Sequence, residues 1–101
     1  MKLWSEKKGS AVKVFCEGDI DEHTVYEIRT YIDRLAVRGI TSLELCMKYV
    51  DFMDSTGVGM LLGRYKKLTK MNVPLYVSEV NAQVDKVFKL SGIYSVIPLV
   101  R

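Results

Sequence analysis

Hydrophobic and polar positions follow two different periodicities along the chain, and segments of the two kinds alternate. Some short runs alternate with a period of two, as strands do, whereas longer segments place apolar residues three and four positions apart, as amphipathic helices do. We expect strands at residues 3–7, 11–16, 42–48, 74–78 and 95–100, and helices at 22–38, 55–70 and 81–92. This order, ββαβαβαβ, predicts an α/β fold with a mixed, mostly parallel β-sheet covered by helices, in which the first two strands form a hairpin.

Several residues mark where these elements begin and end. Asp21 is expected to cap the first helix, and Gly39 to stop it. Asn81 is expected to cap the third helix, which ends near Gly92. Pro98 has no backbone N–H to donate, so the last strand is predicted to lie at an edge of the sheet.

The expected helix at 55–70 has one apolar side. Its members are Val58, Leu61, Leu62, Tyr65 and Leu68. At 100° per residue, Met60 points nearly away from this stripe. We therefore expect Met60 to be exposed and to belong to a contact surface. The basic run of Arg64, Lys66, Lys67 and Lys70 is interpreted as a solvated helix face that can attract an acidic partner.

Composition narrows the class of protein. The chain has 101 residues, 49% hydrophobic and 27% charged, which is typical of one globular domain. A net charge of +3 is small for a dedicated nucleic-acid binder. We find no apolar run long enough for a membrane span and no signal peptide, so we expect a cytoplasmic protein that binds neither nucleic acid nor membrane. Cys16 and Cys46 are expected to be buried, reduced thiols.

Candidate chemistry lies where strands lead into helices, since sites of α/β sheets form beyond the carboxyl ends of the strands. Two loops qualify, residues 17–24 and 52–59. In the second, Asp54, Ser55 and Thr56 are all plausible helix caps. Capping does not account for Gly57, Gly59 and Gly63, each of which costs about 1 kcal/mol relative to alanine inside a helix. Close approach by the protein's own sheet, by an anion or by another protein would account for them.

Known phosphate-binding and catalytic motifs do not fit these residues. The glycines match neither the P-loop nor the dinucleotide pattern. His23 is the only histidine and the two cysteines are far apart in sequence, so no metal site or cofactor is expected. A hydrolytic triad of Ser55, His23 and Asp54 is disfavoured, because adjacent residues do not easily take the required geometry. A phosphate carried by Ser55 itself fits better, since the first turn of a helix stabilises negative charge.

The chain resembles the STAS domain family of bacterial anti-sigma factor antagonists, in particular its sporulation-type members. The resemblance rests on residues 52–66, which include Asp-Ser-Thr-Gly, on the loop at 17–24, which resembles the family's Gly-Glu-Leu-Asp-His-His-Thr, and on residues 88–93. It spans nearly the whole chain and implies a single STAS domain over residues 1–101. Relatives of this type carry a further helix after the last strand, and this chain stops at Arg101.

The resemblance implies a switch rather than an enzyme. The unphosphorylated antagonist is expected to bind an anti-sigma factor that is also a serine kinase, which frees the sigma factor. The kinase is expected to phosphorylate Ser55, with Thr56 as a less favoured second hydroxyl, and a phosphatase resets the protein. Asp54 would orient the loop, and Asp21 would support the docking surface. The expected partner-binding residues are Asp21, His23, Asp54, Ser55, Thr56, Gly57, Gly59, Met60, Gly63 and Arg64.

Other interpretations of the same residues stay open at this point. One is a STAS-type ligand-binding module that takes a nucleotide or lipid near Gly57. Another is a small hydrolase that uses Ser55, and a third is an assembly subunit in which Ser55 is only a helix cap. The sequence does not decide the sigma factor, the pathway or the oligomeric state.

Overall fold

The computed structural model describes residues 1–101 and contains one five-stranded sheet, three α-helices and a short 3-10 helix. The strands lie in chain order across the sheet, with β1 antiparallel to β2 and the other neighbours parallel. The expected α/β class, the first hairpin and the order ββαβαβαβ are therefore confirmed. The elements are β1 (Lys2–Lys8), β2 (Ala11–Ile20), α1 (Val25–Ala36), β3 (Ser42–Met53), α2 (Ser55–Lys70), β4 (Leu75–Ser78), α3 (Ala82–Ser91), the 3-10 helix (Ile93–Ser95) and β5 (Leu99–Val100).

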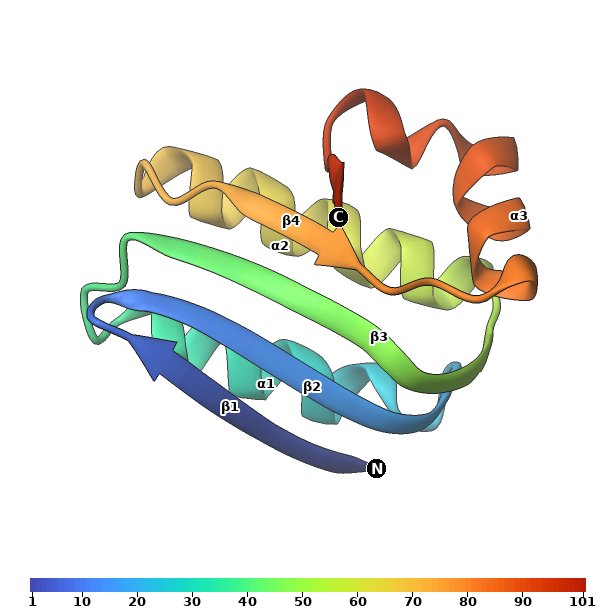
Figure 1. Cartoon of the computed structure of the whole chain (residues 1–101), viewed down its shortest axis with the longest axis horizontal. Helices are drawn as coiled ribbons and strands as arrows, with labels where there is room; N and C mark the ends of the chain where they lie inside the picture. Colours follow the sequence, from blue (N-terminus) through green and yellow to red (C-terminus); the bar gives the residue numbers. More distant parts are fainter.

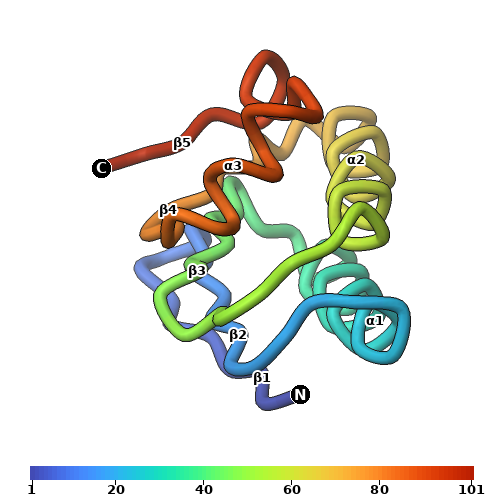
Figure 2. Tube along the Cα trace, turned by 90° about the vertical axis from the view of Figure 1, so that its right-hand side faces the viewer, coloured from blue at the N-terminus to red at the C-terminus, as the bar shows by residue number.

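The helices α1 and α2 lie side by side on one face of the sheet (Figures 1 and 2). Parallel strands in chain order, each joined by a right-handed crossover, place successive helices on the same face. The third helix, α3, packs at the carboxyl ends of β3 and β4 (Figure 1). The core fills the space between sheet and helices. Its fully buried members include Val14, Leu45, Val77, Ile32, Leu61 and Phe88.

The opposite face of the sheet is covered by its own side chains. Trp4 stacks on Phe15 with ring centroids 5.3 Å apart and an interplanar angle of 5°. Tyr49 lies against both rings. Lys13 extends over the Phe15 ring, so that only 8% of Phe15 is exposed. The helical face and its loops, rather than this face, carry the candidate site.

The strands β2 and β3 are longer than their sequence pattern predicts. Residues 17–20 and 49–53 were expected to be loop or connecting stretch, and they are strand. Pairing of β2 with β3 shifts register between Phe15 and Glu17 and again between Gly18 and Ile20. Each such bulge interrupts the alternation of side chains, which is why the strands do not look continuous in the sequence.

Two other boundaries also differ from the expectation. The helix α1 begins at Val25, and its N-cap residue is Thr24, so Asp21 does not cap it. The expected strand at 95–100 is reduced to Leu99–Val100, because the preceding residues turn in a 3-10 helix. The edge position of this strand is confirmed.

The helix α1 ends at Ala36, two residues before the expected end at Arg38, and its C-cap residue is Val37 rather than Gly39. The expectations about α2, the cap of α3 and the thiols are confirmed. The helix α2 runs from Ser55 to Lys70 as predicted, and Asn81 caps α3 by accepting a hydrogen bond from the Val84 amide at 2.9 Å. Cys16 and Cys46 are free and buried. Burial raises the pKa of the Cys16 thiol to about 12. No helix combines the length and the apolar character that crossing a membrane requires.

Candidate functional site

The two loops chosen from the sequence meet at one end of the molecule. The last residues of the two neighbouring strands, Ile20 and Met53, pair with each other. The Asp54 amide donates a hydrogen bond to the Ile20 carbonyl at 3.2 Å. The loop that follows β2 and the start of α2 therefore form one continuous surface at the carboxyl ends of the parallel strands, where sites of this fold class form.

The start of α2 is fixed by Asp54. Its Oδ1 accepts a hydrogen bond from the Thr56 amide at 2.9 Å, and its carbonyl accepts one from the Gly57 amide at 3.1 Å. Ser55 is the first residue of the helix, and its side chain is exposed. Since Asp54 supplies the cap, the helix start does not depend on the Ser55 hydroxyl. Asp54, rather than Ser55, is therefore the cap of this helix.

The three glycines of α2 have different surroundings. A Cβ at Gly57 would lie 2.7 Å from Met53 Cγ and 2.9 Å from Ile20 Cγ2, so the ends of the two strands leave no room for one. For Gly57, the approaching object is the protein's own sheet. A Cβ at Gly59 or Gly63 would have nothing within 4 Å.

The end of β3 is held by α3, which the sequence did not reveal. The Gln83 side chain accepts a hydrogen bond from the Met53 amide and donates one to the Met53 carbonyl, each at 2.9 Å. Asn81 donates to the Val50 carbonyl at 3.0 Å. These contacts fix the residues directly before Asp54. The capping role of Asn81 was visible in the sequence, but contacts to a strand 30 residues away have no local signal.

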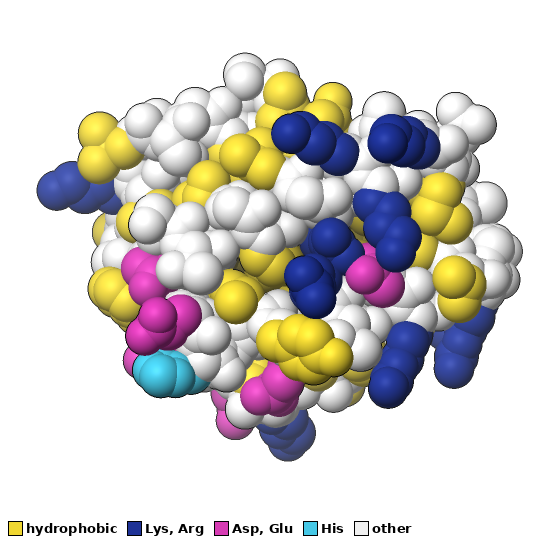
Figure 3. Space-filling view, turned by 180° about the vertical axis from the view of Figure 1, so that it is seen from behind, with side chains coloured by type: hydrophobic (Ala, Val, Ile, Leu, Met, Phe, Trp, Pro, Cys, Tyr) yellow, Lys and Arg dark blue, Asp and Glu magenta, His cyan; other side chains and the backbone are white.

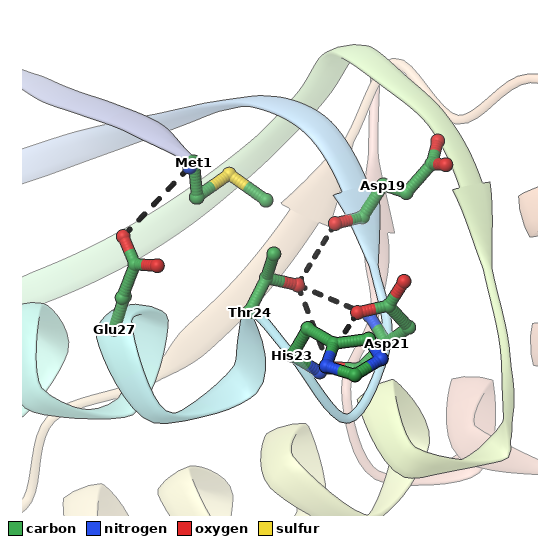
Figure 4. Close-up of polar contacts among 6 residues, drawn as sticks. All are labelled: Met1, Asp19, Asp21, His23, Thr24 and Glu27. Atoms are coloured by element: carbon green, nitrogen blue, oxygen red, sulfur yellow. Dashed lines mark hydrogen bonds and ion pairs between the residues drawn. The ribbon is translucent and has the colours of Figure 1, made fainter.

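The β2–α1 loop, residues 21–24, holds itself together (Figure 4). The Thr24 hydroxyl donates to the Asp19 carbonyl at 2.8 Å and accepts from the Asp21 amide at 3.1 Å. The Asp21 carboxylate accepts from the His23 amide at 2.9 Å. The His23 ring is 81% exposed and lies 3.5 Å from Glu22. Asp21 and His23 therefore belong to a polar, mostly acidic rim beside the Ser55 turn.

Met60 does not lie on an exposed surface, contrary to the expectation. It is only 8% exposed and belongs to the core. The side chain of Arg64 is also mostly buried and pairs with Asp33 of α1, which Lys67 approaches to 3.4 Å. The helical wheel treated the sheet as the only packing partner of α2, whereas α1 also covers one side of it. The expectation of a solvated basic face holds for Lys66, Lys67 and Lys70 but is wrong for Arg64.

A groove of about 520 Å³ runs between α1 and α2. Its walls come from Val25, Tyr26 and Arg29 on α1 and from Thr56, Gly59, Met60, Gly63 and Arg64 on α2. The structure thus divides the predicted residues into two adjoining groups. Asp21, His23, Asp54 and Ser55 form the acidic rim and the helix start. The groove is lined by Thr56, Gly59, Met60, Gly63 and Arg64. Gly57 belongs to neither group, because it is buried against the ends of the strands, contrary to its expected place among the partner-binding residues. Tyr26 and Arg29 were missed, although both lie outside the apolar stripe of α1.

Comparisons with known proteins agree with this architecture. The STAS domain profile matches residues 4–101. The anti-sigma F factor antagonist of Paenibacillus polymyxa is 32% identical over 100 residues, covering 98% of this chain and 86% of that protein. The unphosphorylated form of the anti-sigma factor antagonist SpoIIAA superposes with a TM-score of 0.83 at 27% identity, over 99% of this chain and 89% of the other. The phosphorylated form of the Bacillus cell fate determinant SpoIIAA superposes with a TM-score of 0.74 at 26% identity. This superposition covers 99% of this chain and 92% of that one.

A two-layer α/β sheet with a helix start at the carboxyl ends of its central strands, matched over this length, defines a STAS domain. The chain belongs to the STAS family, and within it to the anti-sigma factor antagonists. Anti-sigma factor antagonists are regulators rather than enzymes, so the expectation of a non-enzymatic role is confirmed.

Proposed function

We propose that phosphorylation of Ser55 controls whether this antagonist binds its partner. In the unphosphorylated state it binds an anti-sigma factor that is also a serine kinase, and the sigma factor is set free in the cytoplasm. Phosphorylation of Ser55 by that kinase ends the binding, and a phosphatase restores it. The observation that carries the proposal is the exposed Ser55 hydroxyl at the first position of α2, in a turn that Asp54 already caps.

The surroundings of Ser55 favour a change of surface rather than of fold. A phosphate adds about −1.5 to −2 charges at pH 7, and a helix N-terminus stabilises negative charge. The turn is fixed by Asp54 and the strand ends, so it keeps its shape when the hydroxyl is modified. The folded structure therefore accommodates the phosphate, and its effect falls on the partner.

The electrostatic effect on a partner is large enough to work as a switch. The phosphate would be placed close to Asp21 and Asp54, which repel it, and a partner surface that fits the neutral Ser55 hydroxyl would have to bury the additional charge without a counter-charge. Burying an unpaired charge at an interface costs about 2–5 kcal/mol. Since each 1.4 kcal/mol is a factor of ten, the affinity would fall about 30-fold to several thousand-fold.

Ser55 is preferred over Thr56 because of their positions. Ser55 is the first residue of α2 and directly follows the cap residue Asp54. The Thr56 amide is engaged by the Asp54 side chain, and the residue forms part of the groove wall. Both side chains are exposed, so the choice between them is decided by experiment.

The test uses the purified chain, the anti-sigma factor kinase of the same cell, and ATP. Intact-mass measurement should show the addition of one phosphate to the native chain and to Thr56→Val, and none to Ser55→Ala. The Ser55→Ala chain should keep binding the kinase after ATP is added, whereas the native chain should dissociate. Modification of Ser55→Ala at Thr56 would move the switch by one residue. No modification of the native chain would refute the phosphoswitch.

A further inference from the structure

The outer side of α2 contains two glycines that the packing of the chain itself does not require. Gly59 and Gly63 are one helical turn apart and therefore share a face. A Cβ at either would meet open space, unlike one at Gly57. A glycine in a helix costs about 1 kcal/mol relative to alanine. Both glycines line the groove between α1 and α2, so they lower the wall of that groove and allow an external chain to approach the helix backbone.

An independent observation concerns the charge around the groove. The Nε of Arg64 is buried without a hydrogen-bond partner, and Arg29 is exposed, lying over the Tyr26 ring at 5.4 Å. Asp33 is the carboxylate that faces this cluster, and it already pairs with Arg64 and Lys67. The positive charge of Arg29 therefore remains available to a ligand.

The wider surface has the same sign. The helices α1 and α2 together carry six basic and two acidic side chains, an excess of four, whereas the whole chain has a net charge of +3. Figure 3 shows several Lys and Arg side chains over this helical face, and a group of acidic side chains beside the histidine at one end.

From these observations we infer that the groove between α1 and α2 is a second contact site for the anti-sigma factor and accepts an acidic segment of that protein. The inference rests on the proposed function. The backbone of the segment lies over Gly59 and Gly63, and one of its carboxylates pairs with Arg29. The groove is continuous with the Ser55 turn through Thr56, so a kinase that holds Ser55 also covers the groove.

The experiment measures the affinity of the unphosphorylated chain for the purified anti-sigma factor by calorimetry. Arg29→Glu reverses a charge in the groove, and Arg34→Glu makes the same change at an exposed position of α1 outside it. We expect Arg29→Glu to lower the affinity at least about tenfold, with a weaker dependence on salt, and Arg34→Glu to change it by no more than about twofold. Equal losses for the two variants would show a general effect of net charge and would overturn the inference.

The glycines provide the second arm of the experiment. Gly59→Ala and Gly63→Ala each add one methyl group to the groove wall and are expected to raise the urea midpoint of unfolding, because alanine favours the helix. They should nevertheless lower the affinity at least about fivefold, since the partner's backbone can no longer approach. Variants that are more stable and bind like the native chain would overturn the contact at the glycines.

The outcomes separate this inference from the proposed function. If phosphorylation of Ser55 abolishes binding while the groove variants bind normally, the groove site is refuted and the switch stands. If the native chain does not bind the anti-sigma factor, both are refuted. Titration with ATP or GTP alone, with a signal that Arg29→Glu removes, would identify the groove as a nucleotide site and would also overturn the inference.

Discussion

The two loops beside Ser55 are built in different ways. The β3–α2 connection passes from strand to helix through Asp54 alone, whereas the β2–α1 connection uses residues 21–24. The first is held by distant parts of the chain, since Gln83 binds Met53 and the Ile20 carbonyl accepts from Asp54. The second is held by hydrogen bonds among residues no more than five positions apart.

This difference indicates that the two loops differ in rigidity and can serve different roles at the site. A turn held by several elements keeps the Ser55 hydroxyl in one place, which suits the phosphorylation site that we propose. A loop held only by local polar contacts opens at lower free energy and can adapt to a partner. On the proposed function, this surface combines a fixed position for phosphorylation with an adaptable rim for binding the partner.

The largest expected effect concerns the packing beneath the fixed turn. Gly57→Val would place a branched side chain against Met53 and Ile20, both fully buried. Because such overpacking forces backbone shifts, we expect the free energy of unfolding to fall by about 3 kcal/mol in urea titrations. Gly59→Val is the matched control in open space and should stay within about 0.5 kcal/mol of the native value. Similar losses for both would mean that the ends of the strands do not hold the turn.

A smaller loss is expected when α3 releases the end of β3. Gln83→Ala would leave the amide and carbonyl of buried Met53 without these partners. Unsatisfied buried groups cost about 1–3 kcal/mol, and we expect about 2 kcal/mol here. Hydrogen exchange of the Met53 amide should accelerate by more than the general loss of stability explains. Lys86→Ala, an exposed change on the same helix, is the control. Unchanged exchange at Met53 would show that α3 does not fix the turn.

The sequence predicted those parts of the site that depend on local contacts. The start of α2 and the cap Asn81 follow from side chains within three residues of the helix start, and Asp54 is one of the three caps that the sequence offers for α2. The stripe of Val58 and Leu61 follows from periodicity and is buried as expected. Each of these features is encoded in a short stretch of chain, so pattern alone identifies it.

Features that depend on distant contacts were not predictable from the pattern. Met60 is buried because α1 packs beside α2, and no property of its own helix shows this. The bulges in β2 hide the true length of the strands. The reason for Gly57 became clear only when the ends of two strands, more than 30 residues apart in sequence, were seen to meet beneath it. The role of Gln83 was hidden for the same reason, because its partner Met53 lies 30 residues away in sequence.

The smallest effect on stability is expected in the adaptable loop. Asp21→Ala removes one side-chain hydrogen bond, which the His23 amide donates at an exposed position where water can replace it. We therefore expect a loss of about 0.5 kcal/mol in the free energy of unfolding, well below that of Gln83→Ala. If the rim contacts the anti-sigma factor as we propose, binding should fall by a larger factor than stability, because the variant removes a carboxylate from that rim. Asp19→Ala is the control, since Asp19 contributes its backbone carbonyl to the loop and its side chain lies beside the rim. A loss of stability for Asp21→Ala as large as that for Gln83→Ala would mean that the loop is as firmly fixed as the Ser55 turn, and that recognition and chemistry share one rigid surface.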